Sequence, residues 1–184
     1  MKKITDVFRE DQIILLNNVI NNTTLKQDKI LGRKVGELNL PDDIKGFINN
    51  IVRETYSKSL SLGAISYAEY NNKYGNPNLP PHFDGDDTDI IFNFQLESNT
   101  SWDLGLDLEL YSIENNSALL FNPNKSIHWR PIKQFDDGEY VKMIFFRFRN
   151  SDKSSDYSNL RYSLDHEIFN QVNKLRDSVN NKWF

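Results

Sequence analysis

The chain has 184 residues, of which 38% are hydrophobic and 26% are charged, and its formal net charge is −4. This length allows one domain with a sizeable core, and the composition is typical of a globular protein. The small negative charge predicts no general attraction to nucleic acid or to an anionic membrane, and the absence of cysteine excludes disulfides, thiolate zinc sites and a cysteine nucleophile.

No apolar run in the sequence reaches the length that spans a membrane. The opening residues Met1-Lys2-Lys3 are not followed by the apolar core of a secretion signal. We therefore expect a cytoplasmic protein, in the host cytoplasm if the source is viral. The sequence leaves the oligomeric state open.

Two helices are predicted within about residues 9–58. The first, residues 9–21, places Ile13, Leu16 and Ile20 on one face. The second begins at Leu40-Pro41-Asp42-Asp43, since proline and acidic residues favour the first turn of a helix. Its apolar residues recur every three or four positions and predict a helix that packs on a sheet: Ile44, Phe47, Ile48, Ile51, Val52 and Tyr56. Between the two helices we expect irregular chain with short extended pieces near residues 29–35.

From about residue 62 to residue 149 the hydrophobic period changes to two, which is typical of strands. Strands are predicted at residues 64–70, 88–96, 104–111, 117–121 and 139–148. The second of these has an apolar face (Ile90, Phe92, Phe94 and Leu96) and a mixed face (Asp89, Ile91, Asn93 and Gln95). The third alternates leucine with other residues and has the clearest strand pattern in the chain.

A final helix is predicted at about residues 164–184, with Ile168, Val172, Leu175 and Val179 on one stripe. No repeat or linker divides the chain, so residues 1–184 are expected to form a single domain. Helices, then antiparallel strands, then a helix indicate the α+β class, and the many short strands favour a double-sheet roll of the cupin type.

The residues most suited to bind a metal are His82 and Asp84, followed later by His128. In an extended backbone residues i and i+2 point to the same side, so His82 and Asp84 can reach one ion. Two histidines and one carboxylate form the facial triad of non-haem Fe(II) oxygenases, which leaves coordination positions open. Taken alone, His-x-Asp is a weak signal, and a His–Asp pair in a surface turn explains it better; the addition of His128 and the order of the strands favours the metal site. The chain holds only three histidines, and two of them belong to this arrangement.

Several short motifs between residues 67 and 148 together resemble the 2-oxoglutarate- and Fe(II)-dependent dioxygenases, and in particular small stand-alone oxygenases of bacteriophages and marine bacteria. The motifs are His82-x-Asp84, the strand of residues 90–96, Trp102-Asp103-Leu104, Ala118-Leu119-Leu120-Phe121, His128-Trp129-Arg130, and Gly138 before the last strand. They cover roughly half of the chain.

The resemblance implies a double-stranded β-helix (jelly-roll) core whose larger sheet is buttressed by helices. We expect both N-terminal and C-terminal buttressing helices. It also implies that His82, Asp84 and His128 bind Fe(II), and that 2-oxoglutarate and O2 are used to hydroxylate a protein side chain or a small metabolite, with release of succinate and CO2.

The sequence departs from the family where the far carboxylate of 2-oxoglutarate would be held. Many members have an arginine about ten residues after the second histidine, just past a glycine, and here Tyr140 stands at that place. A buried carboxylate needs a cation, which we expect to be Lys142, with Arg130 and Arg147 as rivals. Four further residues are expected to contribute to the pocket of the co-substrate: Tyr67, Tyr70, Asn93 and Gln95.

Two other functions remain open from the sequence. One is a cupin-like metal-binding or structural protein without oxygenase activity, and the other is a mononuclear metal enzyme that uses metal-bound water. An open pocket with an inward Lys142 or Arg130 beside the triad would favour the oxygenase, and a filled pocket would favour the binding protein. No nucleic-acid partner, membrane or particular substrate is indicated.

Overall fold

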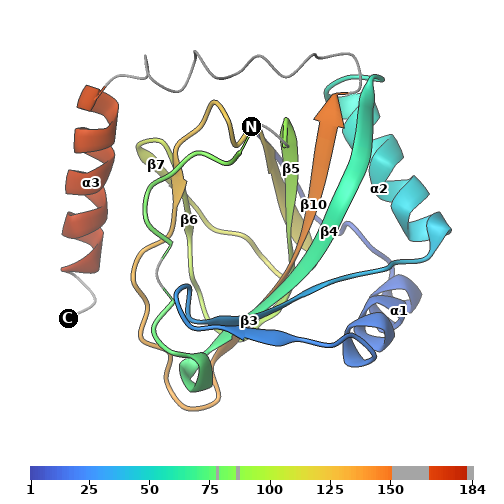
Figure 1. Ribbon diagram of the computed structural model, residues 1–184, viewed down its shortest axis with the longest axis horizontal. Helices are drawn as coiled ribbons and strands as arrows, with labels where there is room; N and C mark the ends of the chain where they lie inside the picture. Colours follow the sequence, from blue (N-terminus) through green and yellow to red (C-terminus); the bar gives the residue numbers. More distant parts are fainter. Residues whose placement is uncertain (78, 86–87, 151–165, 182–184) are drawn as a thin grey trace.

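The computed structural model describes residues 1–77, 79–85, 88–150 and 166–181 of the chain. Two antiparallel sheets face each other, and helices cover their outer faces (Figure 1). The larger sheet has seven strands in the order β1-β8-β5-β10-β4-β3-β2, and the smaller has three in the order β7-β6-β9. This is the double-sheet roll that the strand pattern predicts.

The centre of the larger sheet is formed by β4 (Leu60–Asn71), β10 (Tyr140–Asn150), β5 (Ile90–Ser98) and β8 (Ser117–Phe121). Three short strands extend its edges: β1 (Lys2–Ile4), β2 (Lys26–Asp28) and β3 (Arg33–Glu37). The edge strand β1 pairs with β8 and was not predicted, because three residues with two lysines carry no strand pattern.

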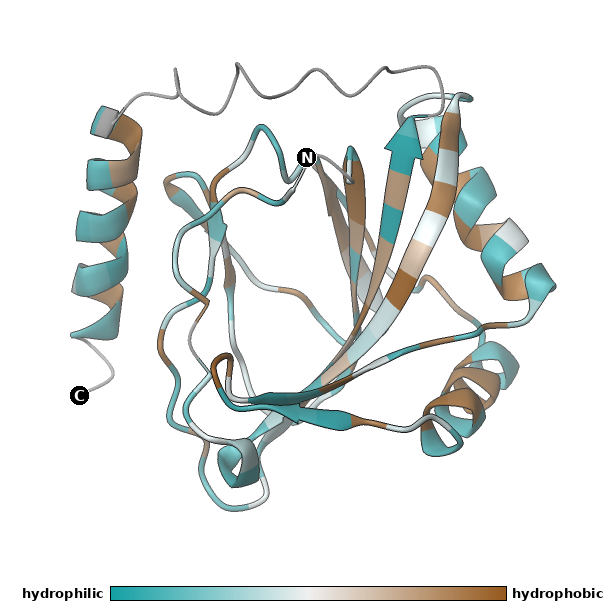
Figure 2. Ribbon diagram, viewed as in Figure 1, coloured by the Kyte–Doolittle hydropathy of each residue, from teal (hydrophilic) through white to brown (hydrophobic). Residues whose placement is uncertain are grey.

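Helices α1 (Glu10–Asn21) and α2 (Asp42–Thr55) cover the outer face of the larger sheet (Figure 1). Ile44, Ile48 and Val52 of α2 are fully buried, as their spacing predicts. They pack in one core with the apolar face of β5, namely Ile90, Phe92, Phe94 and Leu96. Figure 2 shows these apolar stripes on the helices and on the central strands. The opposite face of β5 therefore points between the two sheets.

The smaller sheet contains β6 (Leu104–Leu106), β7 (Glu109–Tyr111) and β9 (His128–Trp129). The prediction of one strand over residues 104–111 is wrong, because β6 and β7 form a tight hairpin. Leu106 pairs with Glu109, so Asp107 and Leu108 make the turn, and Asp107 has a φ of 52°. Aspartate tolerates this left-handed conformation better than most residues, but no glycine marks it in the sequence.

The last helix, α3 (His166–Asn180), covers the smaller sheet and not the larger one (Figure 1). Its Phe169, Val172, Leu175 and Val179 pack against Ile127, Trp129 and Phe83. The N-terminal helices therefore buttress the larger sheet, and the C-terminal helix buttresses the smaller one. Residues 164–165 and 182–184 of the predicted helix lie outside the described residues. No helix among the described residues is both long and apolar enough to cross a membrane.

Candidate metal centre

Two distant segments bring the candidate metal ligands together at one edge of the smaller sheet. The backbone of His82 pairs with that of His128: the His82 N–H donates to the His128 carbonyl at 3.1 Å, and the His128 N–H donates back at 2.9 Å. The Asp84 N–H donates to the carbonyl of Pro123 at 3.0 Å. These bonds hold the ligand segment in the extended form that turns the side chains of residues 82 and 84 to the same side.

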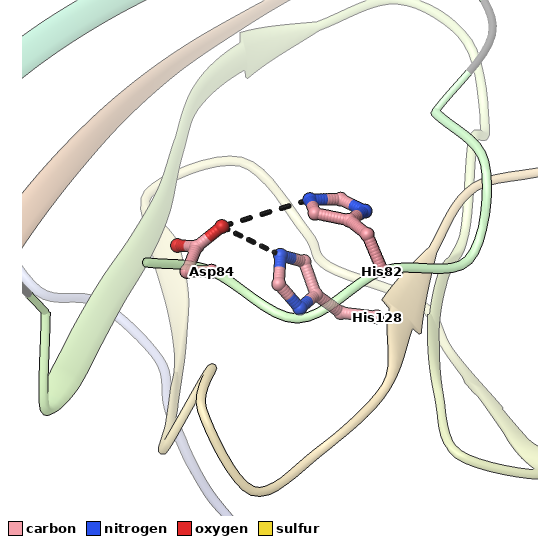
Figure 3. Close-up of side chains that lie close together, drawn as sticks. All are labelled: His82, Asp84 and His128. Carbon is pink, nitrogen blue, oxygen red and sulfur yellow. Dashed lines mark ion pairs between the residues drawn. The ribbon is translucent and has the colours of Figure 1, made fainter. Parts of the chain in front are cut away.

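The three side chains converge on one point, as Figure 3 shows. Asp84 Oδ1 lies 3.3 Å from His128 Nε2 and 3.6 Å from His82 Nε2. One ligand atom from each residue lies within 4.8 Å of the others. Two imidazoles and one carboxylate at this spacing can bind one transition-metal ion and leave the remaining positions of an octahedron open.

The backbone also selects which imidazole nitrogen is available for a metal. His82 Nδ1 lies 2.7 Å from the carbonyl of Pro80, and His128 Nδ1 lies 3.4 Å from the carbonyl of Ser126. A carbonyl only accepts hydrogen bonds, so the protons belong on Nδ1 and the lone pairs on Nε2. Metal-binding histidines are commonly oriented in this way, which makes the donor set fit a metal ion.

The electrostatics of the cluster favour a charged carboxylate. Burial alone would raise the pKa of Asp84, but the hydrogen bonds from His128 and His82 outweigh burial and lower the pKa below its usual range. Burial lowers the pKa of His82, whereas the hydrogen bond to Asp84 raises it, and the net pKa lies above the usual value. In the metal-free protein a proton therefore competes for the position that a cation would occupy.

A cavity of about 130 Å³ extends from the three ligands into the space between the sheets. Its apolar walls come from Leu31, Leu79, Ile91, Leu104, Phe121 and Phe145. Its polar walls, apart from the three ligands, come from Arg33, Tyr70, Asn93, Arg130 and Arg147. The pocket is therefore open and strongly basic.

Arg130 lines this cavity and is only 2% exposed. Its guanidinium donates to the carbonyl of Trp102 and, over 3.1 Å, to Met143 Sδ, and it stacks 4.5 Å from the centroid of the Trp102 ring. No carboxylate of the described residues lies within ion-pair distance of it. Burial lowers the pKa of Arg130 to about 10, so the group still carries its charge at neutral pH. A buried cation without an acidic partner is costly unless an anion joins it.

Three of the other predicted pocket residues also line this cavity, namely Tyr70, Asn93 and Arg147. Arg33 joins them, although the sequence reasoning did not identify it. Its guanidinium donates to Tyr70 Oη at 3.2 Å and pairs with Asp28 at 3.2 Å. Arg33 lies on a short polar edge strand, and nothing in the local sequence indicates that this strand reaches the site.

The structure does not bring Lys142, Tyr67 or Gln95 to the cavity. Lys142 lies on the helix-covered face of the larger sheet, where its ammonium pairs with Glu97 at 2.8 Å. Tyr67 lies on that same face and lines a separate cavity together with Lys142. Gln95 lies between the sheets, but its amide donates to the carbonyl of Ile113 at 2.6 Å and does not line the cavity.

The strand of the second histidine is fixed by close packing around Trp129. Its indole N–H donates to the carbonyl of Asp107 at 3.1 Å, and the Asp107 carboxylate accepts the N–H of Ile127 at 2.9 Å. The ring lies over Gly105, where an added Cβ would stand 2.1 Å from a ring carbon. Only glycine allows this approach, so the hairpin turn and Gly105 together position His128.

Comparison of the sequence with protein-family models gives no match, and comparison with curated proteins gives none either. The structure, in contrast, resembles several solved structures. HygX from Streptomyces hygroscopicus, solved with nickel, 2-oxoglutarate and hygromycin B bound, is 8% identical with a TM-score of 0.66, and the alignment covers 83% of this chain and 84% of HygX.

Two prolyl hydroxylases are similar as well. The viral collagen prolyl hydroxylase of Paramecium Bursaria Chlorella virus-1, in complex with 2-oxoglutarate, is 13% identical with a TM-score of 0.60, covering 80% of this chain and 94% of the viral one. A Pseudomonas putida prolyl-4-hydroxylase is 12% identical with a TM-score of 0.60, covering 81% and 91%. The chain therefore shares its fold with the 2-oxoglutarate- and Fe(II)-dependent oxygenases.

Proposed function

We propose that this protein is an Fe(II)- and 2-oxoglutarate-dependent oxygenase that hydroxylates a small molecule or a protein side chain. One observation carries the proposal: a His-Asp-His cluster opens onto a cavity that is also lined by a buried arginine without an acidic partner among the described residues. The cluster suits a divalent metal, and the arginine suits the far carboxylate of a diacid bound beside that metal. The shared fold of known oxygenases supports this assignment.

In this proposal His82 and His128 bind the metal through Nε2, and Asp84 binds it through its carboxylate. Bound Fe(II), with 2-oxoglutarate and O2, would supply the oxidation: the co-substrate becomes succinate and CO2, and one oxygen atom enters a C–H bond of the substrate. The carbonyls of Pro80 and Ser126 keep the two imidazoles oriented by accepting their Nδ1 protons.

Arg130 would bind the far carboxylate of 2-oxoglutarate, and Tyr70 would donate its hydroxyl proton to the same group. Two facts support this choice over Lys142: Arg130 is buried in the metal cavity, and Lys142 is paired with Glu97 on the opposite face of the sheet. The apolar walls of the cavity exclude water from this ion pair and so strengthen it. Arg130 follows His128 by two residues, so the metal and this cation are held by one segment.

The open pocket argues against a cupin-like binding protein, since a structural role favours a cavity filled with side chains. A hydrolytic metal enzyme needs a group that takes a proton from metal-bound water. Apart from Asp84 itself, the described residues that line the cavity include no carboxylate to do so. These observations favour the oxygenase over both alternatives.

The test is an anaerobic titration with Fe(II) and 2-oxoglutarate, which gives a visible charge-transfer band when both bind the same site. We expect the band in the wild type and none in Asp84→Ala or His82→Ala, with circular dichroism unchanged in both variants. Wild-type protein that binds metal but shows no band would refute 2-oxoglutarate as co-substrate. A band that persists in Asp84→Ala would refute the assignment of the metal ligands.

A further inference from the structure

With the metal bound, the cavity holds more positive charge than Asp84 and the two carboxylates of one 2-oxoglutarate can balance. It is lined by three guanidinium groups, Arg33, Arg130 and Arg147, and by one described carboxylate, Asp84. Arg33 has its own acidic partner in Asp28, at 3.2 Å. In the proposed complex, Fe(II) and Arg130 are balanced by Asp84 and the two carboxylates of 2-oxoglutarate. The charge of Arg147 is then left over, which favours binding of one further anion.

The backbone of Arg147 lies at the position of β10 nearest the metal ligands. It pairs across the sheet with Ile91, which pairs with Phe121, and the Phe121 ring lies 5.5 Å from that of His128. Arg130, by contrast, contacts Met143, four residues earlier on β10. Four residues of a strand span about 13 Å, so Arg130 and the backbone of Arg147 lie at different positions along β10.

The surroundings of Arg147 leave its guanidinium available. One Nη donates to Ser66 Oγ at 2.8 Å, and the group lies 5.9 Å from the centroid of the Phe145 ring. Within the described part of the chain, no carboxylate lies within ion-pair distance of it. A planar guanidinium held by a serine and an aromatic ring is well placed to bind a carboxylate with two parallel hydrogen bonds.

Asn93 gives a second, independent indication of a ligand at this place. It lines the cavity and is only 4% exposed, yet its Oδ1 is buried without a hydrogen-bond partner. An amide oxygen accepts hydrogen bonds, and ionised 2-oxoglutarate has none to donate. An N–H or O–H of a bound substrate would satisfy Asn93 Oδ1.

The size of the cavity limits how that molecule binds. Its volume of about 130 Å³ is well below the ~300–1,000 Å³ of pockets that enclose drug-sized ligands. With 2-oxoglutarate inside, only a small reacting end of the substrate can enter. A carboxylate and a hydrogen-bond donor close together form such an end.

We propose that the substrate is a small carboxylic acid with one net negative charge and a hydroxyl or amide N–H next to its carboxylate, such as a hydroxy acid or an N-acyl amino acid. Arg147 binds the carboxylate, and Asn93 accepts the neighbouring hydrogen bond. The inference rests on the proposed function. The reaction is then substrate C–H plus 2-oxoglutarate plus O2, giving substrate C–OH, succinate and CO2.

The test measures binding to the anaerobic Fe(II)–2-oxoglutarate complex by calorimetry. The probes are lactate, 3-hydroxybutyrate, N-acetylglycine, N-acetylalanine and glutamate, each compared with its neutral carboxamide, and glycerol phosphate as a phosphate anion. The variants are Arg147→Gln and Asn93→Leu, with Arg149→Gln as the matched control, since Arg149 is an exposed arginine of the same strand. The affinity of each variant for 2-oxoglutarate is measured first.

We expect at least one acid to bind, its carboxamide to bind far more weakly, and Arg147→Gln to raise the Kd of that acid about 10- to 100-fold. Asn93→Leu should weaken the same acid, and Arg149→Gln should behave as wild type. The affinity for 2-oxoglutarate should stay within about threefold in all three variants.

Four results would overturn the inference: no acid of the panel binds, the carboxamides bind equally well, Arg147→Gln binds the acid as wild type does, or only the phosphate binds. Loss of 2-oxoglutarate binding in Arg147→Gln would also overturn it, because Arg147 would then belong to the co-substrate site. Failure of the wild type to bind 2-oxoglutarate would refute the proposed function itself, and the inference with it.

Discussion

Replacing Arg130 by methionine should separate binding of the co-substrate from stability of the fold. Arg130→Met keeps a long side chain but removes the buried charge that the proposed function assigns to the far carboxylate of 2-oxoglutarate. Removing one partner of a buried charged pair costs about 2–5 kcal/mol. With about 1.4 kcal/mol for each tenfold change, the Kd of 2-oxoglutarate should rise by about 30-fold or more.

Arg130→Met should change the stability of the metal-free protein only slightly, and the change can even be stabilising. Arg130 contributes a hydrogen bond to the buried carbonyl of Trp102, and leaving that carbonyl unpaired costs about 1–3 kcal/mol. Its stacking on Trp102 adds about 1–2 kcal/mol. Against this, the guanidinium is desolvated at 2% exposure without an acidic partner, which costs several kcal/mol in the metal-free protein. The free energy of unfolding should therefore change by no more than about 2 kcal/mol.

Calorimetric titration of 2-oxoglutarate into Mn(II)-loaded protein measures its Kd, and urea unfolding of the metal-free protein measures the free energy of unfolding. Lys142→Met is the matched control, because Lys142 is a cation of β10 that lies on the helix-covered face of the larger sheet, paired with Glu97. Unchanged affinity in Arg130→Met, or a comparable loss in Lys142→Met, would refute the reasoning.

Two further predictions concern the metal itself. The hydrogen bond to Asp84 outweighs burial and raises the pKa of His82 above 6.5. The His82–Asp84 pair therefore stabilises the metal-free protein below pH 6.5, and this stabilisation is lost as the pH rises through the raised pKa. Metal binding needs the neutral imidazole, so the gain in Tm on adding Mn(II) should grow over that same window while the metal-free Tm falls; a gain independent of pH would contradict this. Phe83 lies between two ligands, and its ring meets that of Phe169 on α3 edge-on at 5.5 Å. Phe169→Ala should weaken Mn(II) binding by up to about tenfold, and Ile168→Ala, at an exposed position, should not; equal effects of both would show that α3 does not support the ligand segment.

The sequence predicted the larger features because they depend on regular spacing. The alternation in residues 88–96 assigned the two faces of β5 correctly, and the stripe of Ile44, Ile48 and Val52 identified the buried face of α2. The same kind of spacing placed His82 and Asp84 on one side of the chain, whereas the position of His128 beside them came from the resemblance to a known family.

The basic residues of the pocket were harder to predict because β10 is aromatic on both faces. Phe145 lies on the cavity side, whereas Phe146 and Phe148 lie in the helix-covered core. The pattern therefore does not show on which face of the sheet Lys142 lies. Its long side chain made it a reasonable candidate for the co-substrate carboxylate, but it lies on the other face. The hairpin was missed because leucine alternation continues through the turn at Asp107.

His128 and Arg130 lie on one short segment and face the same cavity. Two residues of extended chain set their backbones about 7 Å apart. Any displacement of this segment would carry the metal ligand and the cation together, so their spacing stays constant while the rest of the pocket adjusts. In the proposed function, the length of diacid that fits between the metal and Arg130 would therefore depend chiefly on these three consecutive residues.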